Sequence, residues 1–389
     1  MDQLPKVTQP AAYRIRIAGR VNNGWSDFMS NLEESYGQEN GVTITTIAGV
    51  VTDQAALHGL LERIRDMNLT LLSVVCDGPC TQDFDTEIKE KKMRLLIAGS
   101  HGMVGSAVTR YLIENGHEVV RLVRHAAGPA EVYWNPDIAE IDTAGLEGFD
   151  GVINLASIRW PMRWTEKAKQ KMRANRLVTN RLLAESLATC EYKPKVFICA
   201  AGMGYYPPSG DDILTEDCPA GTSFLSKLDQ DAEEITAPAT SAGIRVVHLR
   251  MPTVLGGERL KMLGFQAGDG QQWMSWIGRD EVASIIEFAL ETETLSGPVN
   301  TVSPNPMRLS DFAKTATEAM GQKPGGVMPA FIVRLIMGEM GEEFLLASRR
   351  VQPAKLLAAG YRFRFPELAD ALRHEQAAMD ASVAAGVVV

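Results

Sequence analysis

The first 80 residues combine strand and helix periodicities. Residues 13–18 alternate between polar and apolar side chains, and residues 41–51 are rich in Val, Thr and Ile, so both segments are predicted to be strands. From residue 53 to residue 67, apolar side chains recur at the spacing of an amphipathic helix. A short strand is predicted to follow at residues 69–75. These patterns predict a small α+β domain over residues 1–80.

Beyond residue 92, strands that are apolar almost throughout alternate with amphipathic helices. Strands are predicted at residues 93–98, 118–123, 151–156, 195–200, 245–249 and 298–302. Helices are predicted at about residues 103–115, 165–189, 228–241 and 279–292. Apolar strands separated by helices are typical of a parallel sheet covered on both faces. The predicted fold class is therefore α/β, a Rossmann doubly wound parallel sheet with a small C-terminal α/β lobe.

Changes in composition along the chain indicate where the domain boundaries are expected. Residues 81–92 are polar and end in the charge run KEKK, which predicts a solvated linker. The Rossmann domain is expected over residues 93–372, with its C-terminal lobe from about residue 300 to residue 372. The Ala/Val-rich residues 373–389 are expected to form a frayed tail.

Charge and hydropathy exclude several classes of partner. A formal net charge of −9 and a pI near 5.3 argue against nucleic acid, because binding phosphate backbones needs a basic face. No apolar run reaches the roughly 18–20 residues that span a bilayer, and the N-terminus lacks the pattern of a secretion signal. A cytoplasmic location without a membrane span is therefore expected.

The cysteines do not predict a metal site. Two of them form CDGPC, and no second Cys or His pair lies at zinc-like spacing. Unpaired thiols are the simpler interpretation. The five cysteines are Cys76, Cys80, Cys190, Cys199 and Cys218.

A glycine-rich segment, GSHGMVG, follows the first strand of the second domain and opens its first helix. Glycines at such a turn let a pyrophosphate approach the backbone N–H groups at the helix N-terminus, where the helix dipole favours negative charge. The strand–turn–helix–strand context favours nucleotide binding over an empty turn. The residues predicted to line this site are Gly99, Ser100, His101, Gly102, Met103, Val104 and Gly105.

The tip of the next strand indicates which dinucleotide binds. NAD-selective folds place an acidic residue there to bind the ribose hydroxyls, and this chain has Arg124 instead. A guanidinium matches a 2′-phosphate, so NADP(H) is favoured over NAD(H), with a solvated strand-end arginine as the alternative. Leu155 and Ala156, at the end of VINLA, complete the predicted cofactor-binding set.

Several longer motifs resemble the epimerase-like family, a branch of the extended short-chain dehydrogenases of the NAD-dependent epimerase/dehydratase type. The similarity covers about residues 93–372 and implies an NADP(H) site with a small lobe closing over a substrate cleft. The first domain, with WSDF at Trp25 and DQAALHGLLERIRD at Asp53, resembles a small uncharacterised bacterial domain. The motifs of the larger match are GSHGMVG, VINLA, RWT, GYY, LTED, GIRVVHLR, QWMSWI, LSGPVN, SPNP and QPAKLLAAGYRFRFP.

The chain departs from the catalytic pattern of the extended dehydrogenases. Their Tyr, and the Lys four residues later, align with Leu225 and Asp229, and their Ser aligns with Ala201. The Lys normally lowers the pKa of the Tyr, so an acid in its place reverses that effect. The resemblance therefore does not carry over the usual acid–base set.

Three other residues are candidates for proton chemistry. Tyr205 and Tyr206 follow the fifth strand of the Rossmann domain, at the carboxyl edge where such sheets bind ligands. Asn175 falls where extended dehydrogenases carry a supporting Asn. The alternatives are buried, satisfied tyrosines and an ordinary polar helix position. Trp273 and Trp276 either line an apolar substrate site or pack the small lobe.

The sequence is compatible with two functions. The degenerate catalytic set favours a protein that binds NADP(H) as a structural or redox-sensing ligand and docks a protein partner through its N-terminal domain. The alternative is an NADPH-dependent oxidoreductase or epimerase acting on a small carbonyl, alcohol or sugar-like substrate.

Overall fold

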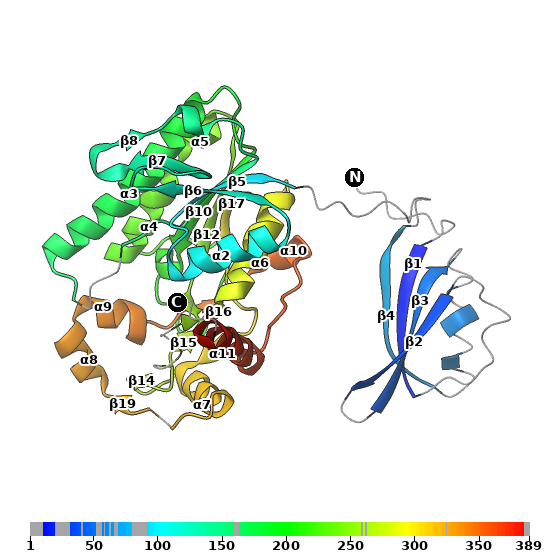
Figure 1. The fold of residues 1–389 in the computed structure, drawn as a ribbon. Helices are drawn as coiled ribbons and strands as arrows, with labels where there is room; N and C mark the ends of the chain where they lie inside the picture. The colour runs from blue at the N-terminus through cyan, green and yellow to red at the C-terminus, as the bar shows by residue number, and fades with distance from the viewer. Residues whose placement is uncertain are drawn as a thin grey trace. The chain divides into compact units, whose positions relative to one another are not determined.

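The computed structural model describes residues 11–19, 32–39, 42–51, 57, 59–61, 64–65, 69–79, 92–158, 163–257, 260, 263–323 and 325–384. The chain divides into two units, Met1–Lys89 and Glu90–Val389, and each is described by itself (Figure 1). Trp25, residues 53–56 and Cys80, which the sequence analysis singles out, lie outside the described residues.

The described residues of the first unit form a four-stranded antiparallel sheet in the order β2-β3-β1-β4. Its core contains Ile15 and Ile17 from β1 and Ile47 from β3, packed against Leu60 and Ile64. Leu60 and Ile64 are helical, in agreement with the predicted helix. The strands are β1 Ala11–Ala18, β2 Leu32–Glu39, β3 Val42–Val51 and β4 Thr70–Pro79.

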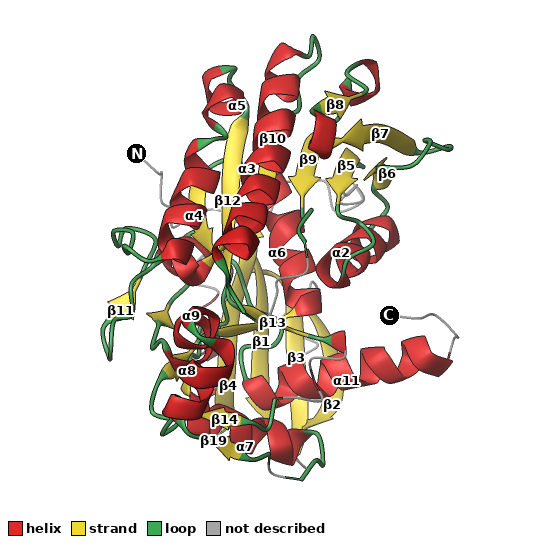
Figure 2. Ribbon diagram, turned by 90° about the vertical axis from the view of Figure 1, so that its left-hand side faces the viewer, coloured by secondary structure: helices red, strands yellow, loops and turns green. Residues whose placement is uncertain are grey.

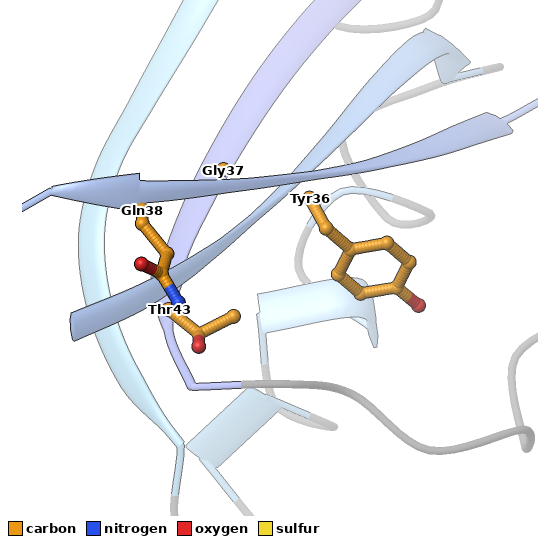
Figure 3. A pocket seen from close by; sticks show the side chains of 4 residues that line it. All are labelled: Tyr36, Gly37, Gln38 and Thr43. Atoms are coloured by element: carbon orange, nitrogen blue, oxygen red, sulfur yellow. The ribbon is translucent and has the colours of Figure 1, made fainter. Parts of the chain in front are cut away.

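A shallow hollow of about 390 Å³ lies along β2 and β3 of this unit. Its lining side chains, Tyr36, Gln38 and Thr43, and the backbone of Gly37 carry no charge at neutral pH (Figure 3). Tyr36 and Gln38 alternate with Gly37 along β2, and Gln38 pairs directly with Thr43. The lining offers neither a cation nor a metal-ligand set, so we assign it no chemistry.

The second unit is built on a sheet with the strand order β17-β12-β10-β9-β5-β6-β7-β8. The described strands of this sheet pair in parallel, except that β8 runs antiparallel to β7. The order reverses between β5 and β9, which is the switch point where doubly wound sheets bind ligands. The strands are β5 Arg94–Ala98, β6 Glu118–Val123, β7 Glu131–Asn135, β8 Glu140–Ile141, β9 Gly151–Asn154, β10 Val196–Gly202, β12 Arg245–Met251 and β17 Gly297–Asn300.

Helices cover both faces of this sheet, as Figure 2 shows. Along β5, Leu95 and Ile97 face the core that includes α2 and α6, whereas Leu96 and Ala98 face the core that includes α3 and α5. The prediction of a doubly wound α/β fold is therefore confirmed. The helices are α2 Met103–Glu114, α3 Glu166–Thr189, α4 Phe224–Glu234, α5 Ala237–Ser241 and α6 Arg279–Glu291.

The structure differs from the predicted elements in several places. The helix expected at residues 228–241 is two helices, because α4 ends at Glu234 and Pro238 lies in the first turn of α5. Strand β7 was not predicted, since EVYWN is too short to show a clear period.

The C-terminal lobe consists of short helices and two-stranded pairs. Its helices are α7 Leu309–Ala319, α8 Ala330–Met337, α9 Glu339–Gly341, η5 Glu342–Leu346, α10 Ala354–Ala358 and α11 Leu368–Ala384. The pairs join β11 Ile213–Leu214 to β20 Arg350–Val351, β13 Thr253–Leu255 to β16 Trp276–Gly278, β14 Gln266–Ala267 to β19 Val327–Met328, and β15 Trp273–Met274 to β18 Met307–Arg308.

The last helix corrects the boundary expected at residue 373. That position lies inside α11, whose Leu368 and Leu372 pack against Phe312 and Trp276. Glu375 is also buried, with 1% of its surface exposed. Residues 373–384 therefore belong to the packed helix, because apolar contacts and a buried carboxylate hold it in place.

Candidate functional site

The glycine-rich segment forms a tight turn between β5 and α2. Gly99 has a φ of +80°, and the Gly102 N–H donates a hydrogen bond of 3.0 Å to the Gly99 carbonyl oxygen. A Cβ atom on Gly105 would lie 2.0 Å from that same oxygen, so no larger residue fits without moving the turn. Gly99 needs the left-handed region, and Gly105 needs the close approach.

The turn lies against the end of β9, at the switch point of the sheet. The Leu155 N–H donates to the Ala98 carbonyl oxygen at 2.9 Å. A Cβ on Gly99 would lie 2.6 Å from the Leu155 carbonyl carbon and 2.7 Å from the Ala156 nitrogen. The structure thus brings together the two groups of residues that the sequence predicts to bind the cofactor.

A pair of buried asparagines, absent from the predicted set, supports this junction. The Asn154 side-chain NH₂ donates to Asn180 Oδ1 at 2.8 Å, and Asn154 Oδ1 accepts from the Ala156 N–H at 3.1 Å. Asn180 in turn donates to the Ala232 carbonyl oxygen at 3.0 Å. The sequence could have indicated this pair, since Asn154 ends the apolar run VIN. A polar amide at the end of a buried strand needs hydrogen-bond partners inside the protein.

The N-terminus of α2 can receive an anion. Gly102 is its N-cap residue, and no side chain in the described part of the chain caps the helix there. Its first turn also contains no acidic residue. The N–H groups at such an end carry a partial positive charge, which suits a phosphate. Of the neighbouring predicted residues, Ser100 is buried and His101 is exposed, with Ser100 Oγ 3.3 Å from His101 Nδ1.

Arg124 directly follows β6, as predicted, and its side chain is half exposed. Its Nη1 lies 3.9 Å from Asp137 Oδ2, and the Asp137 side chain is 78% exposed. An ion pair this long and this exposed contributes little. The guanidinium therefore remains available to a ligand, but it has an acidic neighbour that the sequence analysis did not consider.

The Tyr206 side chain is fully buried and hydrogen-bonded on both sides. Its hydroxyl donates to Asn300 Oδ1 at 2.7 Å and accepts from Arg250 Nη1 at 2.8 Å. Burial raises the pKa of Tyr206 to about 12, although Arg250 opposes the shift. Glu233 holds Arg250 through two hydrogen bonds, of 2.7 and 2.8 Å. This geometry is that of a structural phenol.

Tyr205 is in a different environment. It is half-buried in the short helix η3 Met203–Tyr205, and the Arg250 guanidinium carbon lies 3.4 Å from its ring centroid. The Tyr205 hydroxyl makes no hydrogen bond to another described residue. Asn175 is half-buried on α3, and its carbonyl oxygen accepts from Thr179 Oγ1. No hydrogen bond links Asn175 to either tyrosine within the described residues.

Leu225 and Asp229, which the sequence predicts to replace the usual dehydrogenase Tyr and Lys, are both buried. Leu225 is buried on α4 and packs against Trp164, and Asp229, one helical turn later, is 1% exposed. Burial raises the pKa of Asp229 to about 6, while the Arg176 guanidinium, 3.4 Å away, opposes the shift. A Cβ on Gly202 would lie 2.6 Å from Asp229 Oδ2. The carboxyl group therefore fills the space next to the end of β10.

The two tryptophans differ in their surroundings. Trp276 is 1% exposed and packs with Leu255 and Phe312 in the core of the lobe, as the packing interpretation expects. Trp273 donates from its indole N–H to Asp211 Oδ1 at 2.7 Å. The guanidinium carbons of Arg308 and Arg350 lie 4.4 and 4.3 Å from its ring centroid. Stacked guanidiniums and an indole hydrogen bond hold Trp273 in place.

Neither a metal cluster nor a membrane-spanning helix occurs in the described part of the chain. No group of three His, Cys, Asp or Glu side chains there is arranged to hold a metal ion, and no helix there is long and apolar enough to cross a bilayer. Cys190 and Cys199 are buried, and burial raises the pKa of the Cys199 thiol.

Comparison with known proteins identifies the class of protein that this fold and site define. The NAD dependent epimerase/dehydratase family matches residues 95–301, which is more than half of the chain. Two domains of unknown function match residues 12–75 and 328–375. The chain therefore belongs to the NAD dependent epimerase/dehydratase family, and the predicted resemblances of both domains are confirmed.

Within this family, the chain is similar to the proteins called epimerase family proteins. One from Mycobacterium leprae is 36% identical over 296 residues, covering 73% of this chain and 96% of its own. The human epimerase family protein SDR39U1 is 33% identical over 295 residues, covering 72% of this chain and 99% of its own.

Two solved structures are also similar to the structure of this chain. That of human SDR39U1 with NADPH has a TM-score of 0.64 at 31% identity, covering 73% of this chain and 99% of its own. A nucleoside-diphosphate sugar epimerase from Corynebacterium glutamicum has a TM-score of 0.63 at 27% identity, covering 91% of this chain and 74% of its own.

Proposed function

We propose that this protein binds NADP(H) across the switch point between β5 and β9. The observation that carries the proposal is the uncapped N-terminus of α2, reached through a turn that accepts only glycine at Gly99 and Gly105. Backbone N–H groups from Met103 onward would hold the pyrophosphate, and Arg124 would hold the 2′-phosphate. The NADPH in the structure of human SDR39U1 supports this choice of ligand.

We further propose that the bound nucleotide acts mainly as a structural or redox-sensing ligand. Leu225 and Ala201 supply no hydroxyl where the extended dehydrogenases place their Tyr and Ser, and Asp229 is committed to Arg176. A general acid–base group ordinarily contributes about 10²–10⁴ in rate. Without it, tight binding with little turnover is the simpler outcome. Such a ligand stabilises the folded protein by mass action.

The test is a titration of the purified full chain with NADPH and with NADH, followed by nicotinamide fluorescence. Gly102→Asp places a carboxylate at the proposed phosphate position and should weaken NADPH binding by more than about tenfold. Gly102→Ala is the matched control, because its Cβ would make only an ordinary 3.4 Å contact with the Gly99 oxygen. Equal NADPH affinity in wild type and Gly102→Asp would reject the site.

The proposal includes docking of a protein partner through the first unit. Edge strand β4 exposes Leu71, Leu72 and Val74, with 43%, 46% and 36% of their surfaces accessible. Exposed apolar side chains on an edge strand are a recognised site of strand pairing. Leu72→Lys should abolish co-purification of a partner and leave NADPH affinity unchanged. Co-purification that persists in this variant would contradict docking through β4.

The second candidate function is an NADPH-dependent oxidoreductase or epimerase that acts on a small carbonyl, alcohol or sugar-like substrate. Tyr205 favours it, because its hydroxyl is uncommitted among the described residues and Arg250 stacks on its ring. A proton donor needs such a hydroxyl within reach of the substrate. A substrate screen that finds turnover in the wild type and not in Tyr205→Phe would establish this function. Turnover unaffected by Tyr205→Phe would exclude Tyr205 as the donor.

A further inference from the structure

The segment that follows β13 lies against the first turn of α2. Gly256 and Gly257 come directly after Leu255, with φ angles of +146° and +56°. A Cβ on Gly257 would lie 3.8 Å from both Cγ and Sδ of Met103, the first residue of α2. A segment from the far half of the sheet thus reaches the proposed phosphate-binding turn.

Two buried charged residues support Gly256 from the other side. A Cβ on Gly256 would lie 3.1 Å from the Arg279 Cβ and 3.1 Å from Glu375 Oε2. Arg279 is 3% exposed and Glu375 is 1% exposed, and Arg279 Nε lies 3.5 Å from Glu375 Oε2. A side chain at position 256 would therefore require one of these neighbours to shift, and the φ of +146° also disfavours any residue other than glycine.

Glu375 also fixes the start of α6 from α11. Its Oε1 accepts a hydrogen bond of 3.1 Å from the Asp280 N–H, which lies in the first turn of α6. Glu375 therefore acts as the N-terminal cap that Gly278 does not provide through a side chain of its own. His374 and Arg110 contact the Asp280 carboxylate at 3.0 and 3.4 Å and complete the charged surroundings.

The buried carboxylate of Glu375 lowers the stability of the folded state. Glu375 Oε2 accepts no hydrogen bond from any described residue. Burial raises the pKa of Glu375, and Asp280 nearby raises it further. The Oε2 atom has only the Arg279 ion pair at 3.5 Å, and a buried ion pair without a hydrogen bond packs α11 at a higher free-energy cost than an apolar side chain would. A positioning role at the neighbouring site explains the carboxylate better.

We propose that Glu375 is a positioning residue for the bound dinucleotide. It holds Gly256 and Gly257 against the first turn of α2, so that this segment forms one wall of the site on the nicotinamide side. The order of the strands indicates this side. Arg124 follows β6, on the side of the switch point where the adenosine half would bind, whereas Gly256 follows β13, which comes directly after β12 on the other side of the switch point. The inference rests on the proposed function.

The test compares two nucleotides on the full chain. Adenosine 2′,5′-bisphosphate carries the adenosine and the 2′-phosphate of NADPH and lacks its nicotinamide half. Glu375→Ala should weaken NADPH binding by about tenfold and change the affinity for the bisphosphate by less than about twofold. Glu375→Gln keeps an acceptor for the Asp280 N–H and should recover part of the NADPH affinity. If Glu375→Ala does not fold, Glu375→Gln carries the comparison.

Asp370→Ala is the matched control on the same helix, because Asp370 is 57% exposed and pairs only with Arg373 among the described residues. It should leave both affinities unchanged. Equal losses for both nucleotides in the Glu375 variants would show a general structural role and overturn the inference, as would no loss for either. Failure of the wild type to bind either nucleotide would overturn the proposed function itself.

Discussion

The carbonyl oxygen of Gly99 lies where a side chain at position 105 would begin. A Cβ atom added to Gly105 would be 2.0 Å from that oxygen. The strand, the turn and the first helical turn are therefore locked together by one close backbone approach. Such an approach suits a site that presents backbone N–H groups to an anion, because no side chain stands in front of them.

Gly105→Ala should disturb this turn although alanine is the better helix former. Overpacking of this kind costs about 1–3 kcal/mol, and we expect the free energy of unfolding in urea to fall by that amount. Ser106→Ala, on the exposed side of the same turn, is the control and should change it by less than about 0.5 kcal/mol. Equal stability of the two variants would show that the turn relaxes freely.

Arg124→Gln should separate the two dinucleotides. Loss of the guanidinium removes the proposed contact to the 2′-phosphate, so NADPH affinity should fall by about tenfold while NADH affinity stays the same. Asp137→Asn removes the acidic neighbour and should raise NADPH affinity by less than about threefold. Paired fluorescence titrations measure both effects. A parallel loss of NADH and NADPH affinity would place Arg124 outside the 2′-phosphate site.

Tyr206→Phe should cost stability. The substitution leaves Arg250 Nη1 and Asn300 Oδ1 buried without their partner, which lowers the free energy of unfolding by about 1–3 kcal/mol. Tyr205→Phe removes a hydroxyl that has no described partner and should change stability by less than about 0.5 kcal/mol. Chemical denaturation of both variants checks this. A larger effect for Tyr205→Phe would contradict the assigned structural role of Tyr206.

Asp229 should make stability depend on pH in an unusual direction. Burial raises its pKa from the ordinary value of 3.8 to about 6 on folding, so the folded state binds the proton more tightly than the unfolded state. The contribution is therefore fully present below about pH 4 and is lost as the pH rises to about 6, by up to about 3 kcal/mol. Most paired carboxylates behave in the opposite way.

Asp229→Asn tests this sign, since the variant cannot titrate at that position. The stability of wild type minus that of Asp229→Asn should fall between pH 4 and pH 6 and stay level above it, as measured by urea denaturation across the pH range. A difference that rises with pH would mean that Arg176 dominates and that the folded pKa lies below the unfolded one.

The periodicity of the chain was sufficient for the fold class and for the place of the glycine turn. Continuous apolar runs such as residues 95–98 have neighbours on both faces of the sheet, and that burial leaves a pattern in the sequence itself. The motifs were sufficient for the family, because the family that they predict matches residues 95–301. The cofactor set and the three proton-transfer candidates stay predictions.

Contacts between distant segments were not predictable in this way. Asn154 and Asn180 are 26 residues apart, and Asp280 and Glu375 are 95 residues apart. A buried polar residue looks like a surface one in a single sequence, because its partner is chosen by the packing of separate helices and strands. For the same reason the sequence assigned residues beyond 372 to a tail, although α11 continues through them.

The sequence by itself determined most of the strands and helices of the Rossmann domain, the glycine turn and the family, because each depends on neighbouring residues. Only the tertiary structure decided that Tyr206 is a satisfied buried phenol and that Tyr205, next to it, keeps an uncommitted hydroxyl among the described residues. The physical reason is that burial and hydrogen-bond partners belong to the packed chain and are not properties of a residue type.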